Sequence, residues 1–278
     1  MRLVKQLGAV VLVAVAGSLA VRAVEQSWLL TLVVGVAAAV LMLVAYRWVV
    51  RRTENRDVVE VGAAGAVPEL SRGVGIGVLM FVLVIACLTG LGAYRVEGWG
   101  SATTAIGFVG FTAAAVMTEE LIFRGILFRV LEERAGTWMS LVLTGLLFGA
   151  MHLVNPEATV WGALAIAVEA GFMLAAAYAA TRRLWLPIGL HLGWNVAAAG
   201  IFGTEVSGSG APQGVLSGVT SGPVLVSGGA FGPEGSVFAV LAGVVLTGVL
   251  MTVAHRRGRI VPRRRRATTP AAAATVAR

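Results

Sequence analysis

The sequence has few charged residues, and this scarcity excludes most soluble folds. Charged residues make up 13% of the 278 positions, hydrophobic residues make up 58%, and the mean hydropathy is +0.87. A soluble domain cannot hide so much apolar surface from water. The composition therefore predicts a protein whose main solvent is lipid.

Cysteine and aspartate each occur only once. Cys87 lies inside an apolar run, which excludes a disulfide within the chain and a cysteine-rich metal site. Asp57 is the single aspartate, which excludes a two-aspartate protease mechanism within one chain. The chain also lacks an HExxH motif and a GxSG motif accompanied by a histidine in an apolar segment. Three known chemistries of intramembrane proteolysis are therefore absent.

Apolar runs long enough to cross a bilayer are abundant. A helical span needs roughly 17–25 such residues. We identify eight spans and predict an all-α, polytopic membrane helical bundle. The spans are residues 7–21, 28–46, 74–94, 102–131, 138–154, 158–180, 184–202 and 237–254.

The arginines and lysines alternate between the connections, as expected for a membrane protein. Of 22 basic residues, 19 fall on one side of the predicted bundle, Arg22 and Arg95 fall on the other, and Arg124 lies inside a span. Basic connections stay in the cytoplasm. We therefore expect a multi-pass protein of the cell membrane with both termini cytoplasmic.

One transmembrane domain, residues 1–255, accounts for nearly the whole chain. Residues 1–23 also fit a cleaved secretory signal, and this alternative stays open. The Gly/Ser-rich stretch 203–235 is expected to be a flexible external loop, and residues 256–278 a disordered, basic cytoplasmic tail. A basic cluster directly after a span is more typical of binding to anionic lipid headgroups than to nucleic acid.

Several polar residues interrupt the apolar spans, and such residues are usually functional or paired. The fourth span contains Glu119, Glu120 and Arg124, the fifth contains His152, and the seventh His191 and Asn195. Glu120 and Arg124 are four residues apart and share a helix face, so an ion pair is expected. Glu119 is rotated by about 100° from Glu120 and points elsewhere. His191 and Asn195 also share a face.

The polar groups of the three spans fall at similar depths. At about 1.5 Å per residue from the cytoplasmic ends, Glu119 lies roughly 20 Å deep, His152 roughly 21 Å, Asn195 roughly 18 Å and His191 roughly 12 Å. The GxxxG pairs of the fifth and seventh spans favour close helix approach. The sequence therefore predicts one wet pocket near the bilayer middle, in which a carboxylate activates water and neighbouring groups stabilise an oxyanion.

Three motifs in order on these spans resemble the CAAX-protease and bacteriocin-processing (CPBP) family, which includes the type II CAAX prenyl endopeptidases. They are EExxxR at 119–124, FxxxH at 148–152 and HxxxN at 191–195. The likeness covers residues 118–195, within a family-like core at about 74–203.

The resemblance implies roles for these residues. Glu119 would be the general base, His152 would position water or a metal, and His191 with Asn195 would stabilise the oxyanion, with Glu120 and Arg124 as structural support. Glu119, His152 and His191 would be the ligands if the enzyme used one divalent metal such as zinc. Water activated by glutamate without any metal is the alternative that we favour.

The expected function is an intramembrane endopeptidase that cleaves a peptide or a membrane-tethered protein. The family is also linked to bacteriocin processing and self-immunity, so a catalytically silent immunity or scaffold protein is one alternative. A proton-coupled transporter is another, because buried Glu and His residues also relay protons. Glu169, in the sixth span, matches no motif and receives no predicted role.

Overall fold

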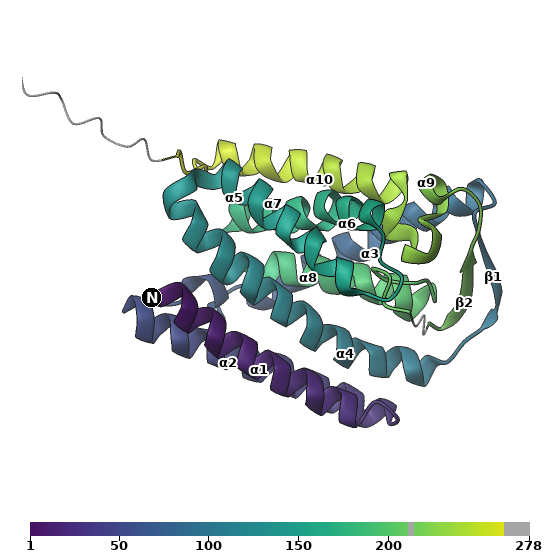
Figure 1. The fold of residues 1–278 in the computed structure, drawn as a ribbon, viewed down its shortest axis with the longest axis horizontal. Helices are drawn as coiled ribbons and strands as arrows, with labels where there is room; N and C mark the ends of the chain where they lie inside the picture. Colours follow the sequence, from purple (N-terminus) through teal and green to yellow (C-terminus); the bar gives the residue numbers. More distant parts are fainter. Residues whose placement is uncertain (211–213, 264–278) are drawn as a thin grey trace, which may run out of the picture.

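The computed structural model describes residues 1–210 and 214–263, which form a bundle of long helices with a small β-ribbon at one end (Figure 1). The α-helices are α1 (Arg2–Ala23), α2 (Trp28–Glu54), α3 (Ala66–Gly90), α4 (Ala102–Glu120), α5 (Arg129–Met151), α6 (Val160–Ile166), α7 (Met173–Thr181), α8 (Trp185–Asn195), α9 (Val224–Ser227) and α10 (Val237–Arg256).

Shorter elements complete the fold. Three π-helical segments continue α4, α6 and α8, namely η2 (Leu121–Phe128), η4 (Ala167–Phe172) and η5 (Val196–Ile201). The strands are β1 (Tyr94–Trp99) and β2 (Leu216–Thr220), and the 3₁₀ turns are η1 (Val59–Val61), η3 (His152–Val154), η6 (Gly229–Phe231) and η7 (Pro233–Gly235).

The predicted all-α membrane architecture is confirmed. In the part of the chain that the structure describes, six helical segments are long and apolar enough to cross a membrane. One of them, Ala102–Val154, runs for 53 residues and contains both the fourth and the fifth predicted spans. The chain reverses inside it at Gly136, whose φ of 77° is unfavourable for residues with a side chain. The seventh predicted span corresponds to α8 and η5, with 11 and 6 residues, and is shorter than the six.

The start of α1 and the end of α10 lie at the same end of the bundle, and the β-ribbon lies at the other end (Figure 1). Arg95 belongs to this ribbon. The arrangement agrees with the charge pattern in placing both ends of the described chain on one side.

Glycines allow a close contact between helices α3 and α8. A Cβ atom on Gly77 of α3 would lie 2.2 Å from the carbonyl oxygen of Leu190, and one on Gly193 of α8 would lie 2.3 Å from that of Val74. Gly73 and Gly189 are equally restricted. Since no side chain fits between the backbones, this contact fixes α8, which holds His191 and Asn195, against α3.

The stretch 203–235 has more structure than the sequence predicts. It contributes β2, which pairs antiparallel with β1 from Tyr94↔Thr220 to Trp99↔Leu216, and it also contains α9 and two 3₁₀ turns. Phe231 is buried against Phe148 and Ile166. Backbone pairing and the burial of Phe231 order the described part of this segment, and neither produces a periodic hydrophobic pattern.

The first part of the basic tail packs against the bundle. The backbone N–H of Thr137 donates to the carbonyl of Val261 at 3.0 Å, and the N–H of Val261 donates to the Thr137 hydroxyl at 2.8 Å. Residues 264–278, which hold most of the predicted disordered tail, lie outside the described residues.

Replacing Gly77 by Ala should destabilise the protein by roughly 1–3 kcal/mol, because the new methyl group overpacks the α3–α8 contact. Gly75 lies on the same helix, and a Cβ atom there would meet nothing within 4 Å. Gly75→Ala is therefore the matched control and should be neutral or slightly stabilising. Thermal unfolding in detergent measures both variants, and equal midpoints would contradict the proposed packing.

Candidate active site

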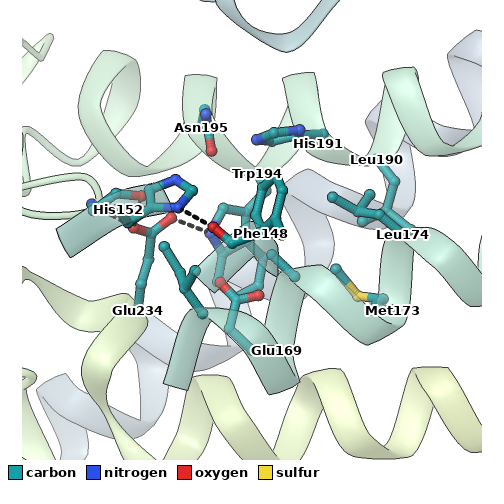
Figure 2. Close-up of a pocket in the computed structure, with 13 residues that line it drawn as sticks. Phe148, His152, Glu169, Met173, Leu174, Leu190, His191, Trp194, Asn195 and Glu234 are labelled. Carbon is teal, nitrogen blue, oxygen red and sulfur yellow. Dashed lines mark hydrogen bonds between the residues drawn. The ribbon is translucent and has the colours of Figure 1, made fainter. Parts of the chain in front are cut away.

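A small cavity lies between α5, α8, η4 and the loop before α10 (Figure 2). His152, His191 and Asn195, three of the four predicted catalytic residues, line it. The remaining lining residues are Phe148, Ile166, Glu169, Ala170, Met173, Leu174, Leu190, Trp194, Ser207 and Glu234. The sequence prediction that the FxxxH and HxxxN motifs share a pocket therefore agrees with the structure.

The buried carboxylate of Glu120 connects two of the three motifs. Its Oε1 lies 2.9 Å from Nη1 of Arg124 and 3.0 Å from Nδ1 of His191. The exposed side-chain fractions are 0% for Glu120 and 1% for Arg124. Since a carboxylate only accepts, Nδ1 of His191 carries the hydrogen, and its Nε2 points away from Glu120. The ion pair expected from the four-residue spacing is present, and it also orients His191.

Arg124 also connects α4 to η4. Its Nη2 donates to the carbonyl oxygens of Ala170 at 3.3 Å and Gly171 at 3.0 Å. Its guanidinium lies 4.5 Å from the ring centroid of Phe148, a cation–π contact. A fully buried arginine is tolerated here because the carboxylate, the carbonyls and the aromatic face replace its hydration.

Glu119 does not line the cavity but lies beside it. Its Oε2 is 3.9 Å from Nε2 of His191, and 32% of its side chain is exposed. This oxygen is buried and has no hydrogen-bond partner among the described residues. Glu119 therefore lies next to the site at the Nε2 side of the His191 ring, whereas Glu120 lies at its Nδ1 side.

His152 lies at the point where α5 ends and η3 begins. Its Nδ1 is 2.8 Å from the carbonyl oxygen of Phe148, so Nδ1 donates and Nε2 is left to accept. The Phe148 ring lies between the two imidazoles, with centroid distances of 4.9 Å to His152 and 6.0 Å to His191. His152 is thus a helix-end residue that nevertheless faces the shared cavity.

Each π-helical segment is adjacent to a polar residue of the site. η2 begins directly after Glu120, η4 contains Glu169, and η5 begins directly after Asn195. A π-turn rotates the following helix face and is often found at functional sites. In η2 the carbonyl oxygen of Gly125 accepts from the Tyr46 hydroxyl and from Nε of Arg129, both at 2.9 Å. Hydrogen-bonding side chains from α2 and α5 therefore stabilise the altered helix below Glu119.

Glu234 is a residue of the site that the sequence did not indicate. Its carboxylate accepts from Nε1 of Trp194 at 2.8 Å, from the Ser207 hydroxyl at 2.8 Å and from the Ser207 backbone N–H. Burial raises the pKa of Glu234 above its usual range, and the donors from Ser207 and Trp194 offset only part of this increase. Glu234 lies in a Gly-rich stretch that the sequence predicts to be unstructured, so no sequence pattern pointed to it. Glu169, the other carboxyl group of the cavity, was recognisable because it interrupts an apolar span.

The residues do not form a three-ligand metal centre. Across residues 1–210 and 214–263, no group of three His, Cys, Asp or Glu side chains is placed to hold a metal ion. Of the suggested ligands, His152 and His191 line the cavity and Glu119 does not. Glu119, His152 and His191 thus do not fit a metal in this arrangement.

Replacing Arg124 by Met should cost about 3–5 kcal/mol of stability, because it leaves the Glu120 carboxylate buried without its cation. Arg95 pairs with Glu97 at 2.7 Å, but their side chains are 60% and 49% exposed. Arg95→Met is the control and should change stability by only about 0–1 kcal/mol. Denaturant titration in detergent measures the free energy of unfolding of both variants. An unchanged free energy of unfolding in Arg124→Met would show that stability does not require the buried ion pair.

Comparison with known proteins supports the likeness seen in the motifs. Residues 100–197 match the family model described as type II CAAX prenyl endopeptidase Rce1-like. A protein of Bacillus subtilis (strain 168), described as "Putative membrane peptidase YdiL", is 34% identical over 77 residues, which are 28% of this chain and 29% of the relative. The match thus spans less than a third of either protein. No solved structure matches the chain. In residues 100–197, which contain the three motifs, this multi-pass membrane protein is similar to the Rce1-like type II CAAX prenyl endopeptidases, a family of intramembrane proteases.

Proposed function

We propose that this protein is an intramembrane endopeptidase that hydrolyses a peptide bond with water activated by Glu119. One observation carries the proposal. The imidazole of His191 lies between two carboxylates, 3.0 Å from Glu120 and 3.9 Å from Glu119, and it borders a cavity shared with His152 and Asn195.

Glu119 suits the role of general base. Its Oε2 has no described protein partner, so it is free to accept a proton from water. A water molecule beside it would also contact His191, whose Nε2 points toward Glu119. When that water attacks the peptide carbonyl, the proton moves to Glu119 and the carbonyl oxygen becomes an oxyanion.

His191 and Asn195 would stabilise the oxyanion. His191 lies between the carboxyl groups of Glu119 and Glu120, which would stabilise its imidazole when both ring nitrogens carry a proton. A protonated imidazole donates from Nε2, and the amide of Asn195 is a second donor on the same helix. His152 would hold the water or the substrate from the other side of the cavity.

The substrate class follows from the location. The site is enclosed by helices that suit a bilayer, so a peptide or a protein segment held at the membrane would reach it more readily than a soluble protein. The name of the B. subtilis relative, which describes a membrane peptidase, supports this reading. The charge pattern favours cytoplasmic termini. Processing of small peptides such as bacteriocins is one role that fits.

Replacing Glu119 by Gln should reduce peptide cleavage about 10²–10⁴-fold, because the amide cannot accept a proton from water. The assay compares cleavage of a hydrophobic peptide library by the purified proteins in detergent. Glu97→Gln is the matched control, since Glu97 lies on the exposed ribbon, and it should retain full activity.

Equal product from the wild type and Glu119→Gln would remove Glu119 from the mechanism. Absence of cleavage by the wild type would favour the silent immunity or scaffold function. Proton flux into sealed vesicles that requires Glu119, without any proteolysis, would instead establish a transporter.

A further inference from the structure

Glu169 is a buried carboxyl group that has no role in the proposed activation of water by Glu119. It belongs to η4, is 1% exposed and lines the cavity with His152, His191 and Asn195 (Figure 2). Its Oε1 has no hydrogen-bond partner among the described residues. An ionised carboxylate in such a place would be unfavourable, because no donor among the described residues replaces the hydration of this oxygen.

Glu234 lines the same cavity and has the opposite environment. It is 2% exposed, but three donors from Trp194 and Ser207 satisfy its two oxygens. Hydrogen bonds of this kind favour the charged form of a carboxyl group. The two carboxyl groups therefore differ sharply in how well their surroundings support a negative charge.

Two carboxylates in one poorly solvated cavity repel each other, so they hold a proton between them. The proton should reside on Glu169, since Glu234 has the donors. Arg124 does not neutralise Glu169, because its guanidinium donates to Glu120 and to the carbonyls of Ala170 and Gly171.

The other groups around Glu169 leave this assignment unchanged. The ionisable groups that line the cavity with it are Glu234, His152 and His191. On the remaining side α10 presents Gly243, whose added Cβ would lie 2.4 Å from the Cα of Glu169. Pairs of acidic groups whose surroundings differ in this way commonly divide the acid and base roles of an active site.

We propose that Glu169 is the general acid of this site, which protonates the departing amine, and that Glu234 is the anionic partner that keeps the proton on Glu169. The inference rests on the proposed peptidase function. Glu119 and Glu169 then act on the same substrate from different sides, one as base and the other as acid.

The protons balance over one cycle. Water loses a proton to Glu119 as its oxygen bonds to the peptide carbon. Glu169 then gives its proton to the amide nitrogen, the C–N bond breaks, and its electron pair stays on nitrogen. The products are a carboxylic acid and an amine. Glu119 is left protonated and Glu169 ionised, and transfer of one proton from Glu119 to Glu169 through water restores both.

The test compares two leaving groups on the same acyl segment, a peptide amide and a 4-nitrophenyl ester. An amine leaves only after protonation, whereas 4-nitrophenolate leaves without it. Glu169→Gln should lower amide hydrolysis about 10²–10⁴-fold and lower ester hydrolysis at least tenfold less. Glu119→Gln should lower both reactions equally, because both need activated water. Glu157→Gln, in the loop after η3, is the matched control and should change neither.

The outcomes separate the two proposals. Equal loss of amide and ester hydrolysis in Glu169→Gln, or no loss, overturns the general acid and leaves the peptidase intact. If the wild type hydrolyses neither substrate, the peptidase itself fails and the catalytic role of Glu169 fails with it.

A spectroscopic readout tests the protonation independently of activity and of folding defects. Infrared difference spectra of wild type against Glu169→Gln should show loss of the C=O stretch of a protonated carboxylic acid. The same band should persist in Glu234→Gln at neutral pH, because burial without hydrogen-bond donors by itself favours the protonated form of Glu169. Thermal unfolding of each variant verifies that it is folded. A spectrum in which Glu169→Gln removes only carboxylate bands would contradict the assignment.

Discussion

The site depends on the interactions of the buried Glu120 carboxylate with Arg124 and His191. This carboxylate accepts from Arg124 on its own helix and from His191 on α8, and Arg124 continues the contact to the backbone of η4. A carboxylate that is 0% exposed persists in a helical bundle only if its charge is compensated. The charge compensation therefore also holds three helical elements at fixed positions around the cavity.

This arrangement divides the paired glutamates of the EExxxR motif into two roles. Glu120 is enclosed and fully partnered, while Glu119 is part exposed and has an unpartnered oxygen. Adjacent residues on a helix point about 100° apart, so one motif supplies both a structural charge and a reactive one. Both lie within reach of His191, which receives its orientation from the first and faces the second.

Much of this site could be predicted from the sequence because residues on a helix are regularly spaced. The Glu120–Arg124 pair, the separate direction of Glu119 and the shared face of His191 and Asn195 follow from a four-residue or one-residue offset. The depth estimate was sufficient to bring His152 into the same cavity as α8. It did not resolve that Glu119 stands beside the cavity, because counting residues along a straight helix ignores the π-helical segment that begins at Leu121.

The contribution of the stretch before α10 to the site could not be predicted from the sequence. Glu234 reaches the cavity through a Gly-rich segment whose order comes from pairing of β2 with β1 and from the burial of Phe231. Such long-range contacts leave no local pattern in composition. In the same way, the sequence showed that Glu169 is an unusual carboxyl group within an apolar span. That Glu234 lies in the same cavity became evident only from the fold.

The most direct test of the account is a double-mutant cycle between Glu120 and His191, with stability measured for Glu120→Gln, His191→Asn and the double variant. The two residues are 71 positions apart in the sequence and meet only if α4 and α8 converge at the site. The structure predicts a coupling free energy within about 0.5–3 kcal/mol, as found for residues in direct contact. Additive effects, with a coupling near zero, would contradict the convergence of these helices on one site.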